Sequence, residues 1–384
     1  MSELSEEKYF SIYSNCILVK GYKQSLIYDL QMGRAKVIPN ILYDLLIEFP
    51  RNIVKEIISK NEDNKKGIEK YLRLLVEENY AFYSDDLSGL NHIDYKYDNI
   101  SIINNAILEL DISFSYYNHN LISYLEKIGI IALQIRAKEN LDEDKIFHFL
   151  SEMKDTTIEY IEVCIKYQNK KFLDKITNLV NSNKRFRNIY IHSSFENKEV
   201  EKQSKSMGNI FLTKKKLISM NHEMDISVND FRCNYELFSE SQKHNTYFNN
   251  KLYIGSSGEI KNAPESEIGF GYIQDLKDVE ELKEIISKSE FQKYWFIYKD
   301  LCDVCRDCEF KHMCVDNRLP YQREDGTWYY KKECNYNPYI GKWQDEKEYK
   351  TLEECGIIVN EKGYNQDQKK VAMINNEELI KPYK

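Results

Sequence analysis

Short apolar runs alternate with helical patterns through the middle of the chain, and this alternation restricts the possible fold more than any other feature. The strand-like runs are AILELDIS (106–113), IIALQIRA (130–137), IEYIEVCIKY (158–167), RNIYIHSS (187–194) and NIFLTK (209–214). The helical patterns between them include NLISYLEKIG (120–129), DEDKIFHFLSEM (142–153) and KKFLDKITNLVNS (170–182). Strands separated by helices usually pair in parallel, so residues 101–227 are predicted to form an α/β unit around a parallel sheet. No Gly-rich phosphate loop follows any of these strands, which argues against a dinucleotide-binding or P-loop protein.

The first 84 residues predict a smaller unit of three strands followed by three helices. The expected strands are 16–20, 25–30 and 35–38, and the expected helices begin at residues 40 and 51 and near residue 68. Ile68, Tyr71, Leu72 and Leu75 recur at i, i+3, i+4 and i+7, which indicates an amphipathic third helix. This order is compatible with a winged-helix domain. The polar stretch 85–100 is predicted to be a linker.

A cluster of cysteines marks the C-terminal third of the chain. The nine cysteines include five within 33 residues, namely Cys302, Cys305, Cys308, Cys314 and Cys334. Cysteines separated by two intervening residues are common ligands of soft metals, so residues 228–345 are predicted to form a metal or cluster domain. Four thiolates suit zinc and a [4Fe–4S] cluster equally. His312 is either a further ligand or a surface histidine beside the site. The segment 346–384 is expected to be a charged C-terminal tail.

Charge and hydropathy exclude several classes of function. The formal net charge is −8, and no basic stripe is present, which argues against a nucleic-acid-binding protein. No run of about 18 apolar residues occurs, so no membrane partner is expected. The first ten residues lack the pattern of a signal peptide, so we expect a cytoplasmic protein.

The cysteine region resembles a known family. CRDCEFKHMCVDNR (305–318) and KKECNYNPYIGKW (331–343) look like the SPASM domain of peptide maturases from grasp-with-spasm systems, which make graspetide-type peptides with an ATP-grasp ligase. SQKHNTYFNNKLYIGSSGEIKN (241–262) resembles the same family. The resemblance covers nearly the whole chain and implies a [4Fe–4S] cluster, or alternatively one zinc, on Cys305, Cys308, Cys314 and Cys334. The family commonly has another cysteine where Asn317 stands. Cys302 is extra here and is the candidate replacement.

The N-terminal unit resembles the PqqD-like domains that recognise leader peptides, with an ordinary winged helix as the alternative. In that family the leader adds a strand beside the third strand and packs on the third helix. The residues that the resemblance assigns to this contact are Lys36, Val37, Ile38, Ile68, Tyr71, Leu72 and Leu75.

SPASM domains usually follow a radical S-adenosylmethionine partial barrel, which needs a CxxxCxxC loop after its first strand. The loop expected at that place, FSYYNHN (114–120), contains no cysteine, and LQIRAKEN (133–140) lacks the glycines of the cofactor motif. We therefore expect a degenerate radical-SAM-like partial (βα) barrel with no S-adenosylmethionine-binding cluster, and a pseudoenzyme rather than an active radical enzyme.

Three functions remain open at this point. The first is an accessory maturation protein that binds the leader of a ribosomal precursor peptide and assists an ATP-grasp ligase. The second is a peptide-modifying enzyme that uses the SPASM cluster or an uncharacterised active site, with His244 as a candidate general base beside Asn245. The third is a zinc-ribbon interaction protein. The sequence identifies no catalytic residue.

Overall fold

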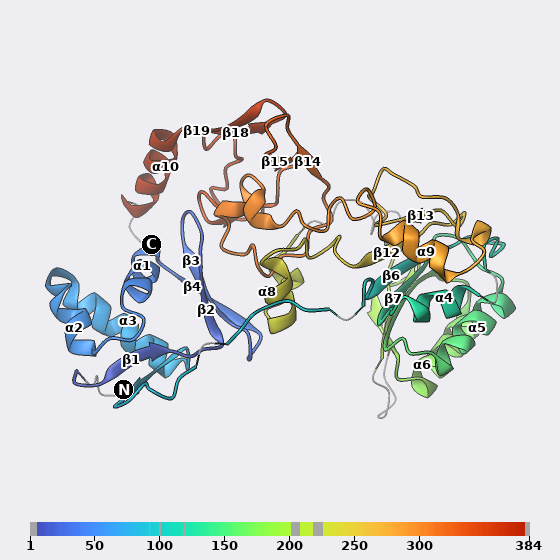
Figure 1. Cartoon of the computed structure of the whole chain (residues 1–384), viewed down its shortest axis with the longest axis horizontal. Helices are drawn as coiled ribbons and strands as arrows, with labels where there is room; N and C mark the ends of the chain where they lie inside the picture. Colours follow the sequence, from blue (N-terminus) through green and yellow to red (C-terminus); the bar gives the residue numbers. More distant parts are fainter. Residues whose placement is uncertain are drawn as a thin grey trace.

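The computed structural model of the chain describes residues 6–91, 93–99, 101–117, 120–200, 208–217 and 226–380, with the backbone alone for 377–380. Figure 1 shows the N-terminal unit in blue and the large sheet in green at opposite ends of the molecule. The cysteine-rich segment, in orange, and helix α8 (Tyr235–Ser241) lie between them. Within the described residues, no helix is both long and apolar enough to cross a membrane.

The helices and strands of the three regions are as follows. The N-terminal unit has β1 (Tyr9–Ile12), β2 (Cys16–Lys20), β3 (Ser25–Asp29), β4 (Arg34–Ile38), α1 (Asn40–Glu48), α2 (Val54–Ser59), α3 (Lys65–Glu77) and β5 (Ala81–Ser84). The central region has β6 (Asn105–Leu110), α4 (Leu121–Lys127), β7 (Ala132–Ala137), α5 (Glu143–Glu152), β8 (Tyr160–Lys166), α6 (Lys170–Ser182), β9 (Phe186–His192), β10 (Lys198–Glu199) and β11 (Asn209–Leu212). After α8 come β12 (Lys251–Ile254), β13 (Ile260–Lys261), α9 (Val279–Ile286), β14 (Pro320–Gln322), β15 (Trp328–Tyr330), β16 (Tyr336–Asn337), β17 (Lys342–Trp343), β18 (Ile357–Asn360), β19 (Gly363–Gln366) and α10 (Gln368–Ile380).

The large sheet confirms the predicted parallel arrangement. Its strand order is β10-β11-β9-β8-β7-β6-β12-β13, and every neighbouring pair from β11 to β12 is parallel. Short antiparallel pairs, β10 with β11 and β12 with β13, close the two edges. The strands β12 and β13 form a hairpin, and β12 joins the same sheet as β6. The fold is mixed α/β with one large, mainly parallel sheet.

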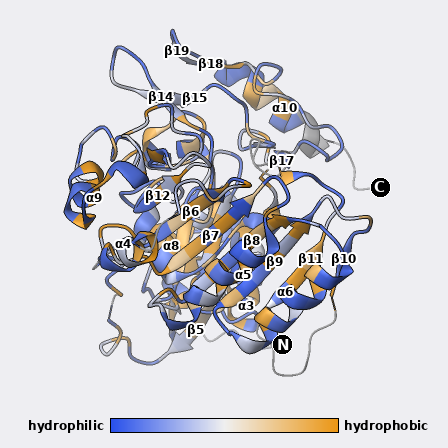
Figure 2. Ribbon diagram, turned by 90° about the vertical axis from the view of Figure 1, so that its right-hand side faces the viewer, coloured by the Kyte–Doolittle hydropathy of each residue, from blue (hydrophilic) through white to orange (hydrophobic). Residues whose placement is uncertain are grey.

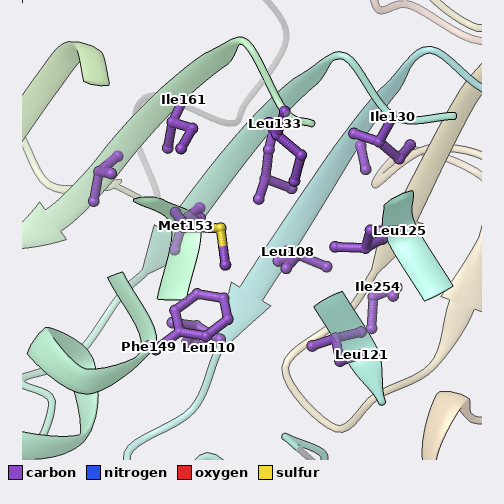
Figure 3. Close-up of a cluster of buried hydrophobic side chains, with 14 of the residues drawn as sticks. Leu108, Leu110, Leu121, Leu125, Ile130, Leu133, Phe149, Met153, Ile161 and Ile254 are labelled. Carbon is purple, nitrogen blue, oxygen red and sulfur yellow. The ribbon is translucent and has the colours of Figure 1, made fainter. Parts of the chain in front are cut away.

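One face of this sheet forms the main hydrophobic core. Successive side chains of a strand point to opposite faces, and the burial of β7 alternates accordingly, with Leu133 and Ile135 buried and Gln134 and Arg136 half-buried. Figure 3 shows Leu108, Leu133 and Ile161 on the strands, near side chains of α4 and the region of α5. In Figure 2, α5 and α6 lie in front of the strands and carry both hydrophobic and hydrophilic residues, as amphipathic covering helices do.

The N-terminal unit contains the three predicted strands as an antiparallel sheet, β2-β3-β4. Every residue of β3 is buried, because the sheet is covered on both faces. Ile27 packs on the side of α1, α2 and α3, whereas Leu26 and Tyr28 pack against Phe238 and Phe310 on the side of the cysteine-rich segment. The sheet is therefore a shared wall between two regions that lie far apart in the sequence.

Two features of the fold differ from the sequence prediction. The unit has a further antiparallel pair, β1 with β5, that brings together its first and last strands. The segment expected to be a charged tail contains the β18–β19 hairpin and α10, as far as residue 380. Cys355, Ile357 and Val371 form a small core there with Tyr339 and Ile340. Charged side chains surround this core, which is why composition alone indicated a tail.

Candidate functional site

Tight turns bring the first three cysteines of the cluster together. The backbone N–H of Arg306 donates to the carbonyl oxygen of Cys302 at 3.0 Å, and that of Cys308 donates to Cys305 at 3.1 Å. Val304, between the first pair, has a φ of +67°. Its ψ is −50°, and the backbone N–H of Cys305 donates to the carbonyl oxygen of Asp303 at 2.8 Å, so Val304 is the central residue of a strained γ-turn.

Burial and mutual repulsion both oppose ionisation of the clustered thiols. Burial raises the pKa of the Cys302 thiol to about 12 and raises the pKa values of Cys308, Cys314 and Cys334 as well. After burial, the proximity of Cys305 is a further cause that raises the pKa of each of the four. The charge of a Cys305 thiolate would therefore oppose ionisation of the other four thiols.

A buried group of charges lies beside these thiols. Lys299 Nζ is 2.6 Å from Asp316 Oδ2, and Arg318 Nη2 is 2.7 Å from the same oxygen. Burial opposes the charge on Lys299, but Asp316 outweighs it and holds the lysine pKa well above its usual value. Two cations and one carboxylate leave a net charge of +1. That excess favours thiolates over thiols, and Lys299 indeed acts to lower the pKa of Cys314 against the effect of burial.

The cysteines have the donor chemistry of a metal site but not its ligand geometry. All nine cysteines are free thiols. Within the described residues, no three or more His, Cys, Asp or Glu side chains are arranged to hold a metal ion. Cys305 packs beside Cys302 and Tyr330, whereas Cys308 and Cys334 pack against a separate apolar cluster that includes Phe310. The sulfur donors and the neighbouring positive charge are chemically suited to a thiolate-bound metal. The assignment of Cys305, Cys308, Cys314 and Cys334 as its ligands stays a prediction.

His312 is a buried side chain rather than a surface histidine. Its Nδ1 atom lies 3.1 Å from the hydroxyl oxygen of Ser241 on α8, and its ring packs edge-on against Phe238. Burial lowers the pKa of His312 to about 4. These contacts link α8 to the cysteine-rich segment.

His244 and Asn245 do not form an acid–base pair. The His244 ring lies 5.1 Å from the ring centre of Tyr97, burial lowers its pKa, and its Nδ1 atom has no hydrogen-bond partner among the described residues. The Asn245 side chain accepts from the backbone of Tyr247 and Phe248 and donates to Ile297 at 2.9 Å. Asn245 is therefore occupied in shaping the turn before β12.

Asn317, at the position where the family commonly has a cysteine, donates to Glu265 at 2.9 Å and is 4 % exposed. Its side chain thus serves a buried polar contact with the loop after β13.

The structure separates the predicted peptide-contact residues into two groups. Ile38, Ile68, Leu72 and Leu75 belong to the core of the N-terminal unit. Val37 is half exposed, and Lys36 Nζ donates to Glu78 Oε1 at 2.7 Å. The helical pattern identified α3 correctly, but Leu72 and Leu75 face the unit's own core.

A cavity of about 230 Å³ lies between α1 and α3, and Ile68 and Tyr71 line it together with Ile41, Leu42 and Leu45. In the described part of the chain, β4 pairs with β3 alone, so its other edge is open. The cavity is also lined by Asp44, Glu48, Asn61 and Asn64. Strand addition by a peptide uses an open strand edge together with pockets for side chains.

The polar face of the large sheet was not identified from the sequence. It borders a cavity of about 430 Å³, lined by Asn105, Ile107, Gln134, Arg136, Tyr160, Glu162, Arg187, Asn188, Tyr247 and Lys251, among others. A second cavity, of about 400 Å³, lies where β6 and β7 end, and Arg136 lines both. Alternation of apolar and polar residues in LQIRA and IEVCIK is the signal that could have revealed this face.

Comparison with known proteins adds little to this description. No protein-family model matches the chain, and no curated protein matches it. Among solved structures, SuiB from Streptococcus suis is similar, both alone and bound to S-adenosylmethionine. The two structures are 8% and 10% identical to this chain and cover 79% and 80% of it, and the matched part covers 94% of SuiB. The TM-score is 0.28 for both. A score this low does not establish a shared fold, so the functional argument rests on the residues of this chain.

Proposed function

We propose that this chain is an accessory protein of peptide maturation, which binds the leader of a ribosomal precursor peptide and assists an ATP-grasp ligase. Two observations carry the proposal: β4 has an open edge, and α1, the helix that directly follows β4, shares with α3 a cavity lined in part by apolar side chains. A leader strand paired with β4 would extend the sheet, and its apolar side chains would reach Ile68 and Tyr71. Backbone pairing with a few anchored side chains typically gives micromolar binding, about −8 kcal/mol.

The position of β4 supports a role in presenting the peptide. Its sheet is covered by the N-terminal helices on one side and by the cysteine-rich segment on the other. A peptide that leaves the β4 edge therefore starts next to both regions. The proposal that an ATP-grasp ligase is the partner rests on the family resemblance alone.

The proposed metal centre uses Cys305, Cys308, Cys314 and Cys334, with Cys302 as the spare thiol. When bound, a metal or [4Fe–4S] cluster would supply folding free energy to the cysteine-rich segment. The buried cations Lys299 and Arg318 would balance part of the negative charge of four thiolates. No S-adenosylmethionine-binding cluster is proposed, because the loop after β6 has no thiolate to offer.

Binding of labelled leader peptides, taken from ribosomal peptides encoded beside this chain and followed by fluorescence anisotropy, tests the proposal. Ile41→Asp places a charge at the mouth of the cavity, where Ile41 is 67 % exposed, so folding should be unaffected. We expect at least tenfold weaker binding, about 1.4 kcal/mol. Ile47→Asp is the matched control, because Ile47 lies on the same helix, is 54 % exposed and does not line this cavity.

Absence of binding to any leader, or an equal effect of both variants, would remove the leader-binding role. The competing function, a peptide-modifying enzyme, predicts a mass change in the peptide that needs this protein and no ligase.

A further inference from the structure

The side chain of Lys251 lies in an unusual environment on the polar face of the large sheet. Lys251 begins β12, is 8 % exposed and lines the cavity of about 430 Å³. Its Nζ atom lies 3.4 Å from the ring centre of Tyr247 and makes no hydrogen bond or ion pair within the described part of the chain. A buried ammonium group without an acceptor is costly, so such a lysine rarely persists without a role.

The carboxylates near Lys251 already have donors of their own. Glu265 accepts from the Tyr247 hydroxyl at 2.9 Å and from Asn317 at 2.9 Å. Glu162 accepts from the side-chain amide of Gln134, whose oxygen in turn accepts from Arg136. Glu265 and Glu240 act on Lys251 electrostatically and favour its charged form, but within the described residues neither forms an ion pair with its amine. Lys251 itself lines the cavity.

Positive charge prevails along the lining of this cavity. Arg136, Arg187 and Lys251 line it, against Glu162 as the acidic residue. Burial lowers the pKa of Lys251 to about 7, and the nearby Arg136 acts in the same direction. An anion bound beside the amine would supply a hydrogen-bond acceptor and a countercharge. It would therefore oppose the lowering of the lysine pKa by burial and by Arg136.

We propose that the polar face of the sheet is a binding site for a carboxylate, held between Lys251 and Arg136. A guanidinium and an amine that line one cavity suit the two oxygens of a carboxylate. The cavity is large enough for an acidic side chain of a peptide or for a free dicarboxylic acid. This site is independent of the leader site at β4, so either can fail without the other.

Calorimetric titration of the full chain with hexaglutamate, hexaglutamine and glutarate tests the site. The net charge of −8 repels acidic peptides in general, so specific binding of hexaglutamate requires a local site. We expect hexaglutamate to bind and hexaglutamine not to bind. If glutarate binds as tightly as hexaglutamate, the ligand is a free dicarboxylic acid. If hexaglutamate binds and glutarate does not, the ligand is an acidic side chain of a peptide.

Lys251→Met keeps the length of the side chain and removes the amine, and we expect at least tenfold weaker binding of the acid. Lys243→Met makes the same change at an exposed position and should leave binding unchanged. Because the variant removes a desolvated charge, its melting temperature should not fall, whereas a purely structural Lys251 would lower it. The proposal would be overturned if the two peptides bind equally well or if no acid binds. It would also be overturned if Lys251→Met binds the acid as tightly as the wild type does.

Discussion

The side-chain amide of Gln24 donates a hydrogen bond of 2.8 Å to the carboxylate of Glu309, a residue 285 positions further along the chain. Glu309 is completely buried, and Tyr28 donates to its backbone oxygen at 2.6 Å. These bonds join the N-terminal sheet to the turn that carries Cys308. The two regions therefore share stability.

Gln24→Ala should destabilise both regions together. The change leaves a buried carboxylate with one donor fewer, which costs about 1–3 kcal/mol. Urea unfolding, followed by far-UV circular dichroism, measures the loss. Gln31→Ala is the control, because Gln31 is exposed, and it should stay within about 0.5 kcal/mol of the wild type. An unchanged midpoint for Gln24→Ala would mean that the two regions are not coupled through Glu309.

Cys308→Ala should reduce both the bound metal and the melting temperature, because a ligand of the proposed centre is lost. Protein purified without oxygen is analysed for metal, and its thermal unfolding is recorded. About four irons with a broad absorption band near roughly 400 nm indicate a [4Fe–4S] cluster, and about one zinc indicates a tetrahedral site. Cys164→Ala is the control, since Cys164 is buried in β8, far from the cluster in sequence, and should change stability without changing metal content. Wild-type protein without metal would contradict the proposed centre.

The stability of the chain should depend on pH through Lys251. Its pKa is lowered to about 7 in the folded protein, whereas an unfolded lysine titrates near about 10.4. Between these values the unfolded chain binds more protons, so the free energy of unfolding rises with pH, and the full penalty is present below about pH 7. Glu265 and Glu240 counteract the shift, and burial and Arg136 cause it.

Lys251→Met removes this term, so the variant should exceed the wild type in stability by most at pH 7 and by least near pH 10. Urea unfolding of both proteins at pH 7, 8.5 and 10 gives the difference between their free energies of unfolding. Contributions from groups that titrate in both proteins cancel in this difference. A difference that is constant with pH would show that Lys251 titrates normally.

Local patterns in the sequence were sufficient for the large sheet. The strands β6, β7, β8, β9 and β11 each carry a short apolar run, and the residues between them, such as Ile146 and Phe149 in α5, repeat with helical period. The spacing of the cysteines predicted a metal site, and that stays a prediction, because within the described residues no three or more ligating side chains are arranged to hold an ion.

Contacts between distant segments could not be read in the same way. The pairing of β1 with β5 joins Phe10 to Tyr83, and no local pattern selects that partner. The apolar stripe of α3 was interpreted as a peptide surface, yet Leu72 and Leu75 are needed for the core of the unit. An amphipathic pattern shows which residues avoid water and does not show what covers them. The polar face of the sheet was missed because Lys251 and Arg136, 115 residues apart in the sequence, come to line one cavity only through the order of strands β12, β6 and β7.

The double covering of β3 has a consequence for synthesis. Tyr28 leaves the ribosome long before Glu309, its partner 281 positions later. At a typical elongation rate of about 5–20 residues per second, that delay is on the order of tens of seconds. During this time Leu26 and Tyr28 lack their covering residues, and one side of the nascent sheet offers apolar surface to other chains. The protein should therefore depend most on chaperones, and aggregate most readily, in the interval after the N-terminal unit is made and before the cysteine-rich segment is made.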